Sequence, residues 1–270
     1  MKKIFLIVSL FTVLCVSAQQ DTLFVWKSGQ LVMKQSILPA DMDSITFKRP
    51  LNFPGPNVTD IDGNTYQSVT NCALTFTKEN LNVSKYSDGT PIPQVTSSNY
   101  YEWSSLTTGA WCYYNDDPAN EAIYGKLYNW YAVAGIYDAA SLANPALRKK
   151  LAPTGWHIPT DAEWTQLIDC LGGEVVAGGK MKATGEYSAG TGLWAGFNVD
   201  ATNISGMTCL PGGYRSYFMF NSKLYGGRWW SSSSFSNAYA WRRFIESYNG
   251  IAYRDSIGKK MGYSVRCIKD

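Results

Sequence analysis

The feature that most constrains the fold of this chain is a series of four short motifs rich in aromatic residues, glycine and arginine. They occur in the order GWHIPTDAEW (155–164), LPGGYR (210–215), WWSSS (229–233) and GYSVRC (262–267). None of them contains a nucleophile paired with a base, or a cluster of metal ligands. Trp rings and the donor fork of Arg can hold loops in place. We therefore expect a loop-rich scaffold.

Residues 1–18 have the pattern of a secretory signal peptide. Lys2 and Lys3 precede an apolar run, and small residues at 16–18 form a cleavage site. The run is shorter than the roughly 18 residues of a membrane span, and no later stretch approaches that length. A lipoprotein modified at Cys15 is the alternative, which the bulky Leu14 disfavours. We expect an exported protein without a transmembrane span, located in the periplasm, at the cell surface or outside the cell.

The composition argues against nucleic acid or an anionic membrane as a partner. Cleavage removes two of the 24 Lys and Arg residues and leaves 22 against 21 acidic residues. Aromatic residues make up 14% of the chain and charged residues 17%. Many rings and few charges are typical of exported proteins that bind through aromatic surfaces, although rings also fill cores.

The chain divides into a small unit and a large domain. Residues 19–49 are predicted to form a small β unit, because short apolar runs flank a turn at 27–30 that contains Gly29. Residues 50–56 contain three prolines and a glycine and are predicted to be a linker. Residues 57–270 then form the main domain.

Local signals in the main domain indicate the α+β class. Thr160 and Glu163 form a capping box at the start of a helix with an apolar face, which ends at 172–173 (GG). A second helical stripe covers 124–136, and Asp62-Gly63 (DG) predicts a hairpin turn rather than a calcium loop. The later chain is rich in turns. We expect about two helices and small antiparallel sheets.

The four motifs, with YSDGTPIP (86–93), LTTGAWCYY (106–114) and YGKLYNWY (124–131), resemble the Fibrobacter succinogenes major paralogous domain over residues 57–270. Segments similar to the small β unit precede such domains in exported proteins of Bacteroidetes-like bacteria. The family has no general biochemical function to carry over.

A more distant likeness is to the formylglycine-generating-enzyme branch of the C-type-lectin-like fold. Residues 159–164, Gly212–Arg215 and 262–267 match its helix start, arginine turn and final strand, with one spacing shift in each of the last two. The resemblance implies a C-type-lectin-like domain whose first and last strands pair, here 58–69 with 263–268. Apart from this likeness, we expect Arg215 and Arg266 to be structural, because the donor fork of each can tie loop carbonyls or a carboxylate together; a direct ligand role is the alternative.

Five cysteines remain after Cys15, so at least one is unpaired. By analogy with the C-type-lectin-like fold, the first disulfide candidate is Cys170 with Cys267 and the second is Cys72 with Cys112. Cys209 would then be free, although the sequence alone does not fix the connectivity.

The catalytic alternatives lack their usual side chains. Formylglycine-generating enzymes use a copper-binding cysteine pair, and only Cys209 and Cys267 follow Cys170. His157 is the single histidine, which excludes a multi-histidine metal site. We expect His157 to be a hydrogen-bonded structural residue.

A polar loop offers the candidate metal ligands Asp116, Asp117 and Glu121, close to Asn115 and Asn120. Such oxygen ligands suit calcium, the one cofactor that the sequence suggests. The same carboxylates could serve a glycosidase or form a solvated turn.

Residues 231–256 are the predicted binding surface. They resemble the variable region of retroelement-diversified lectin-fold proteins, and they combine rigid rings with adaptable polar groups. The candidate ligand-binding residues are Phe235, Asn237, Tyr239, Trp241, Arg242, Tyr248, Asn249 and Tyr253. The alternative is that alternate strand residues pack inward. The prediction is an exported, non-catalytic recognition or adhesion module for a glycan or a protein. The alternatives are an enzyme of the formylglycine-generating or carbohydrate-active type and a structural cell-surface protein.

Overall fold

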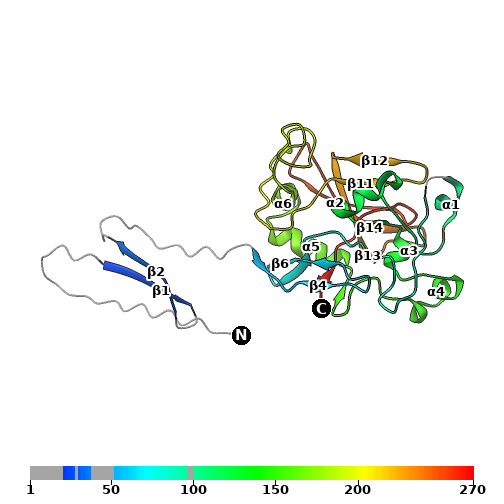
Figure 1. Cartoon of the computed structure of the whole chain (residues 1–270), viewed down its shortest axis with the longest axis horizontal. Coiled ribbons are helices and arrows are strands. Elements are labelled where there is room, and N and C mark those ends of the chain that lie inside the picture. Colours follow the sequence, from blue (N-terminus) through cyan, green and yellow to red (C-terminus); the bar gives the residue numbers. More distant parts are fainter. Residues whose placement is uncertain (1–20, 28–29, 38–51, 97–99) are drawn as a thin grey trace, which may run out of the picture. The chain divides into compact units, whose positions relative to one another are not determined.

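The computed structural model describes residues 21–27, 30–37, 52–96 and 100–270 (Figure 1). Contacts divide the chain into two units, residues 1–49 and 50–270. The expected signal peptide, residues 1–18, and the first two residues of the expected linker lie outside the described residues.

The first unit contains an antiparallel hairpin. Strands β1 (Asp21–Lys27) and β2 (Gln30–Ile37) pair with a register shift between Val25 and Trp26. This pairing agrees with the hairpin that the sequence predicts around residues 27–30.

The second unit is built on a five-stranded antiparallel sheet in the order β10-β16-β7-β6-β3. Its strands are β3 (Asn52–Pro54), β6 (Ser68–Asn71), β7 (Leu74–Thr77), β10 (Trp156–His157) and β16 (Ile268–Lys269). Residues 52–54, which the sequence analysis placed in a linker, therefore belong to this sheet. A proline is tolerated there because β3 is an edge strand.

The final strand pairs differently from the expectation. Ile268 in β16 lies opposite Phe76 in β7, so residues 58–69 are not its direct partner. Instead, β4 (Val58–Thr59) and β5 (Thr65–Tyr66) form a separate hairpin. Its turn at Asp62-Gly63 is confirmed, with φ of 88° at Gly63.

A three-stranded antiparallel sheet carries the predicted binding stretch. It consists of β13 (Gly226–Ser234), β14 (Tyr239–Glu246) and β15 (Ala252–Gly258). Trp229, Ile245 and Ala252 pack into a core shared with the helices α5 and α6. Trp230 and Ala240 belong to a second core, so both faces of the sheet are partly covered.

Helix α5 (Asp161–Cys170) begins as the sequence predicts. Thr160 and Glu163 form both halves of the capping box. Helix α6 (Glu174–Met181) was not predicted, because Gly178 and Gly179 lower helix propensity. Packing explains both glycines: a Cβ at Gly179 would lie 2.4 Å from the carbonyl oxygen of Asp200.

The continuous helix predicted over 124–136 is wrong. The segment contains the end of α2 (Glu121–Tyr124), then β9 (Leu127–Tyr128) and α3 (Trp130–Val133). Gly125, with φ of 68°, ends α2 and turns the chain into β9, which pairs with β8 (Trp111–Cys112).

The described residues contain six α-helices instead of about two, and only α5 and α6 exceed six residues. The remaining elements are α1 (Tyr100–Ser105), η2 (Tyr114–Asp116), η3 (Pro118–Asn120), α4 (Ala139–Ala143), η4 (Pro145–Leu147), β11 (Gly212–Arg215) and β12 (Phe220–Lys223).

The disulfide also differs from both expected pairings. Cys72, in the turn between β6 and β7, is bonded to Cys170 at the end of α5. Cys112, Cys209 and Cys267 are buried free thiols. The two expected bonds fail because Cys112 and Cys267 lie inside hydrophobic cores, whereas Cys72 and Cys170 meet where α5 ends beside the sheet.

Candidate functional site

The eight predicted ligand-binding residues all lie on the β13–β15 sheet or its turns, but they do not form one group. Phe235, Asn237, Tyr239 and Tyr248 are exposed, and Trp241, Arg242, Asn249 and Tyr253 are half-buried. They fall into two groups: Tyr239 and Trp241 share one face of β14, with Phe235 against Trp241, whereas Arg242 and Tyr253 lie on the other face of the sheet.

The first group is the hairpin-end cluster, defined as Phe235, Tyr239 and Trp241. The rings of Phe235 and Trp241 meet edge to face with centroids 5.0 Å apart. The Arg254 guanidinium lies 3.7 Å from the centroid of Trp241, and Asp161 at the start of α5 binds it with a 2.6 Å ion pair. These contacts hold Trp241 in one orientation on the surface.

The second group is the sheet-face cluster, defined as Arg242, Phe244, Tyr253 and Tyr248. Phe244 and Tyr253 are stacked, with centroids 4.7 Å apart and planes inclined by 10°. The Arg242 guanidinium lies 4.5 Å from the centroid of Phe244. Asn249 donates a 2.7 Å hydrogen bond to the Tyr253 hydroxyl.

Arg242 is fixed by a bidentate bond to Asp255. The Nε and Nη2 atoms of Arg242 donate to the two carboxylate oxygens at 2.6 and 2.9 Å, and Nη1 donates to the Tyr263 hydroxyl. Burial lowers the pKa of Arg242, but the bond to Asp255 outweighs it and the pKa is raised. Sequence reasoning did not select Phe244 and Asp255. The period of two along β14, which places Phe244 on the same side as Arg242, could have indicated Phe244.

The arginines of two sequence motifs are structural, as predicted. Arg215 donates to the carbonyl oxygens of Val95 and Thr96 and stacks 4.1 Å from the ring centroid of Trp103. Arg266 donates to Asn80 and to several backbone carbonyls. A guanidinium that satisfies several carbonyls fixes the loops that carry them.

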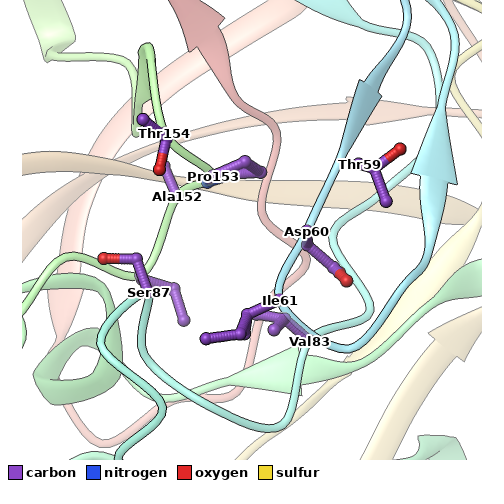
Figure 2. Close-up of a pocket in the computed structure, with 9 residues that line it drawn as sticks. Thr59, Asp60, Ile61, Val83, Ser87, Ala152, Pro153 and Thr154 are labelled. Carbon is purple, nitrogen blue, oxygen red and sulfur yellow. The ribbon is translucent and has the colours of Figure 1, made fainter.

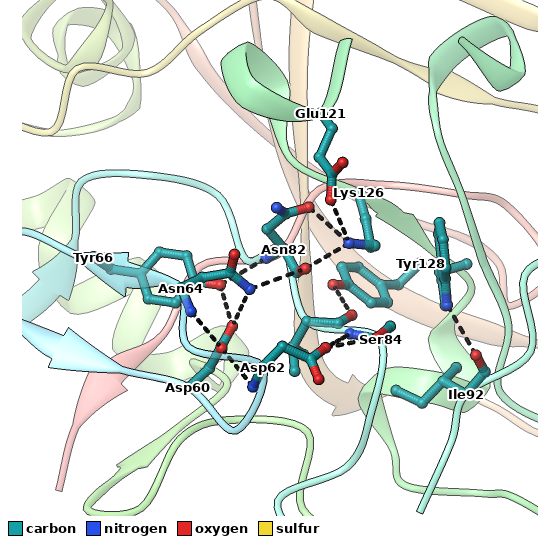
Figure 3. A network of polar contacts seen from close by, with 12 residues as sticks. Asp60, Asp62, Asn64, Tyr66, Asn82, Ser84, Ile92, Glu121, Lys126 and Tyr128 are labelled. Carbon is teal, nitrogen blue, oxygen red and sulfur yellow. Dashed lines mark hydrogen bonds and ion pairs between the residues drawn. The ribbon is translucent and has the colours of Figure 1, made fainter. Parts of the chain in front are cut away.

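A polar network connects the β4–β5 hairpin with residues 82–84, which follow β7, and with Glu121 of α2 and Lys126 (Figure 3). The Tyr66 hydroxyl donates to Asp60 and accepts from the backbone amide of Asn82. The Lys126 ammonium contacts the Asn82 side chain and Glu121, each at 2.9 Å. Burial raises the pKa of Tyr66 far above its ordinary value, so the hydroxyl keeps its proton.

The candidate calcium ligands do not converge. Asp117 accepts a hydrogen bond from the Ala119 amide at the start of η3, and Glu121 pairs with Lys126. Asp116 lies 3.9 Å from the Arg215 guanidinium. Across the described ranges, no group of three or more His, Cys, Asp or Glu side chains is arranged to hold a metal ion. The three carboxylates are used for helix capping and ion pairs.

His157 binds two carboxylates, which agrees with the structural role expected of it. Its ring nitrogens lie 2.7 Å from Asp270 and 2.9 Å from Glu163. Burial lowers the pKa of His157, but the two carboxylates raise it more, so the pKa lies above its ordinary value. The contact ties the final residue of the chain to the start of α5.

Among the cavities formed by the described residues of the second unit are the following two. One, of about 260 Å³, is lined by residues that include Asp60, Ser87 and Pro153 (Figure 2). Its only carboxylate, Asp60, already accepts hydrogen bonds from Asp62, Asn64 and Tyr66. The other, of about 470 Å³, we call the asparagine pocket. Its lining includes Asn64, Asn80, Asn82, Glu121, Leu210 and Arg266.

The sequence pattern of the Fibrobacter succinogenes major domain matches residues 70–269. The chain belongs to this family. The match runs from β6 to β16. The hairpin-end cluster and the sheet-face cluster therefore both lie within the Fibrobacter succinogenes major domain. No curated protein and no solved structure matches the chain. Among the described residues, no helix has the length and apolar character needed to cross a membrane.

Proposed function

We propose that this Fibrobacter succinogenes major domain protein is an exported, non-catalytic recognition or adhesion module. It binds its target through the aromatic-rich loops and strands of the β13–β15 sheet. A glycan is the first ligand class of the proposal, and a protein target is the competing outcome of the test.

The observation that carries the proposal is the exposure of rings on a fixed sheet. Phe235, Tyr239 and Tyr248 expose 56%, 48% and 65% of their surface. The strands that bear or flank them also bury Trp229 and Trp230 in two cores. Aromatic residues held in this way lose little conformational entropy on binding and supply large contact areas.

The sheet-face cluster favours a glycan. The half-buried Tyr253, stacked on Phe244, offers an aromatic surface for the C–H face of a sugar ring. Beside them, Arg242, Asp255 and Asn249 carry donors and acceptors for hydroxyl groups. A few polar groups around aromatic surfaces are typical of small-ligand sites.

We propose that the scaffold is C-type-lectin-like. The support is the position of β16, which lies beside β7 in the same sheet as β6 and β3 and so joins the two ends of the domain. The small separate sheets and short helices fit the same plan.

Three residues bear on the non-catalytic part of the proposal. His157 is engaged by Asp270 and Glu163. Burial raises the pKa of the Cys209 thiol to about 11 and that of Cys267 still higher, which disfavours the thiolates that a copper site needs.

The test uses the mature protein on glycan and protein arrays. We expect a saturable glycan ligand whose affinity falls about tenfold or more in Phe235→Ala and Tyr248→Ala. Tyr101→Ala is the matched control, because Tyr101 is also an exposed ring (80%) but lies on α1. A protein ligand would redirect the proposal, and full binding by both cluster variants would overturn it.

Export has its own test. The protein recovered from the fractions outside the cytoplasm should begin at Gln19, read by N-terminal sequencing. Recovery of a full-length cytoplasmic chain that starts at Met1 would contradict this part of the proposal.

A further inference from the structure

The asparagine pocket has walls from segments that are far apart in the sequence. Thr65 and Tyr66 of β5, residues 78–82, α2, Leu210 and Arg266 all contribute to it. Gly125 allows α2 to approach residues 80–82 closely. A Cβ at Gly125 would lie 2.8 Å from the Leu81 carbonyl oxygen, and its φ of 68° disfavours other residues.

The walls are fixed independently of any ligand. Asn80 donates to the Tyr124 carbonyl at 2.8 Å, and its Oδ1 accepts from Arg266 and from the Trp229 indole at 2.7 and 2.8 Å. Asn82 is held by Tyr66 and Lys126 in the network of Figure 3. Such preorganisation lowers the entropic cost of binding.

The lining also presents an unused donor. Arg266 is 1% exposed, and its Nε and Nη1 atoms donate to Asn80 and to the carbonyls of Thr77, Lys78 and Met207. The Nη2 atom makes no hydrogen bond to any described residue, although Arg266 lines the pocket. A donor that no described residue uses can bond to water or to an acceptor on a ligand.

The charges of the lining cancel. Lys78 and Arg266 are opposed by Glu79 and Glu121, and Glu121 is itself paired with Lys126 at 2.9 Å. A pocket for an anion or a cation would carry an excess of the opposite charge. The lining therefore suits a neutral ligand that can both donate and accept hydrogen bonds.

The volume and the lining of the pocket limit the ligand classes further. The volume of about 470 Å³ lies within the range of small-molecule pockets. Three asparagine side chains line the pocket, while Leu210 and Ile123 add apolar surface to it. Polar hydroxyls and an apolar C–H face occur together in a sugar ring.

We propose that the asparagine pocket binds a neutral saccharide of one or two residues. The pocket shares no lining residue with the hairpin-end or sheet-face cluster, so it is a second site and does not depend on the proposed function.

The experiment titrates the isotope-labelled mature protein with glucose, galactose, mannose, N-acetylglucosamine, cellobiose and lactose. At least one sugar should shift the amide NMR signals of residues 64–66, 78–82 and 121–125. The affinity should not change with salt, because a neutral ligand is not screened.

Ala122→Trp tests the location. Ala122 is an exposed pocket residue on α2, so the larger ring fills space without removing a side-chain contact. We expect affinity to fall about tenfold or more. Ala140→Trp, at an exposed alanine of α4 outside the pocket lining, is the matched control and should bind the sugar normally.

Three results would overturn the inference: no sugar shifts these signals, the shifts map to the aromatic clusters instead, or affinity falls with salt. The mapping uses the wild-type protein, so the test remains decisive if Ala122→Trp does not fold. Loss of binding only in the cluster variants would support the proposed function and reject the pocket.

Discussion

The second unit uses the same side chains differently in two regions. In the five-stranded sheet region, Arg266 is buried and donates to backbone carbonyls, and Cys72–Cys170 joins the sheet to α5. On the β13–β15 sheet, Arg242 and Arg254 lie over the half-buried or exposed rings of the aromatic clusters. A buried arginine that donates to backbone carbonyls takes the place of the water that would otherwise bond them, so it stabilises the fold. An arginine that stacks on a ring at the surface orients that ring for contact with a ligand. We expect substitutions in the first region to change stability and those in the second to change binding.

The disulfide gives the largest expected effect. The double change Cys72→Ala with Cys170→Ala should lower the free energy of unfolding by about 4 kcal/mol, because the bond closes a loop with a sequence separation of 98. Urea denaturation measures the change. Wild-type protein treated with a reductant should match the double variant, and a loss below about 1 kcal/mol would show that this bond is not part of the framework.

Arg266→Met is expected to cost about 3 kcal/mol, since it leaves the buried carbonyls of Thr77, Lys78 and Met207 without their donor. The same change at Arg254, which is exposed, should cost less than about 1 kcal/mol. Equal losses in the two variants, measured by urea denaturation, would remove the distinction between the regions.

Tyr248→Ala should change the free energy of unfolding by less than about 0.5 kcal/mol, because the side chain is 65% exposed. The same variant should still lose ligand affinity on the array. A clear drop in melting temperature, or unchanged binding, would assign Tyr248 to the framework instead.

The smallest expected effect is a pH dependence at His157. Its pKa is raised in the folded state, so its protonated form stabilises the fold. That contribution is complete below the unfolded pKa of about 6.5 and is lost as pH rises through the higher folded value. Because the side chain is 41% exposed, the effect should stay below about 1 kcal/mol. His157→Gln should remove it when stability is compared between about pH 5.5 and pH 8.5. An identical pH profile in the variant would contradict this assignment.

Features that depend on a few neighbouring residues could be predicted from the sequence. The capping box of Thr160 and Glu163 sets the start of α5, and Asp62-Gly63 sets the β4–β5 turn. Both use hydrogen bonds or backbone angles within four residues. The aromatic character of residues 231–256 was also visible, and the structure places rings from this stretch at the surface.

Features that depend on distant partners could not be predicted. Cys170 was expected to pair with Cys267 and instead bonds Cys72. Gly178 and Gly179 argue locally against α6, yet they allow its close packing against Ile251 and Asp200. The asparagine pocket draws Tyr66 and Arg266 together from opposite ends of the domain, and no local pattern relates them.

The sequence by itself determined the family of the protein, its α+β class, its capped helix α5 and the many aromatic residues in its C-terminal part. The tertiary structure decided the disulfide, the pairing of the final strand, the separation of the aromatic residues into two clusters and the asparagine pocket. The physical reason is that caps and turns are set by adjacent residues, whereas pairing and burial depend on which distant segments the whole fold brings into contact.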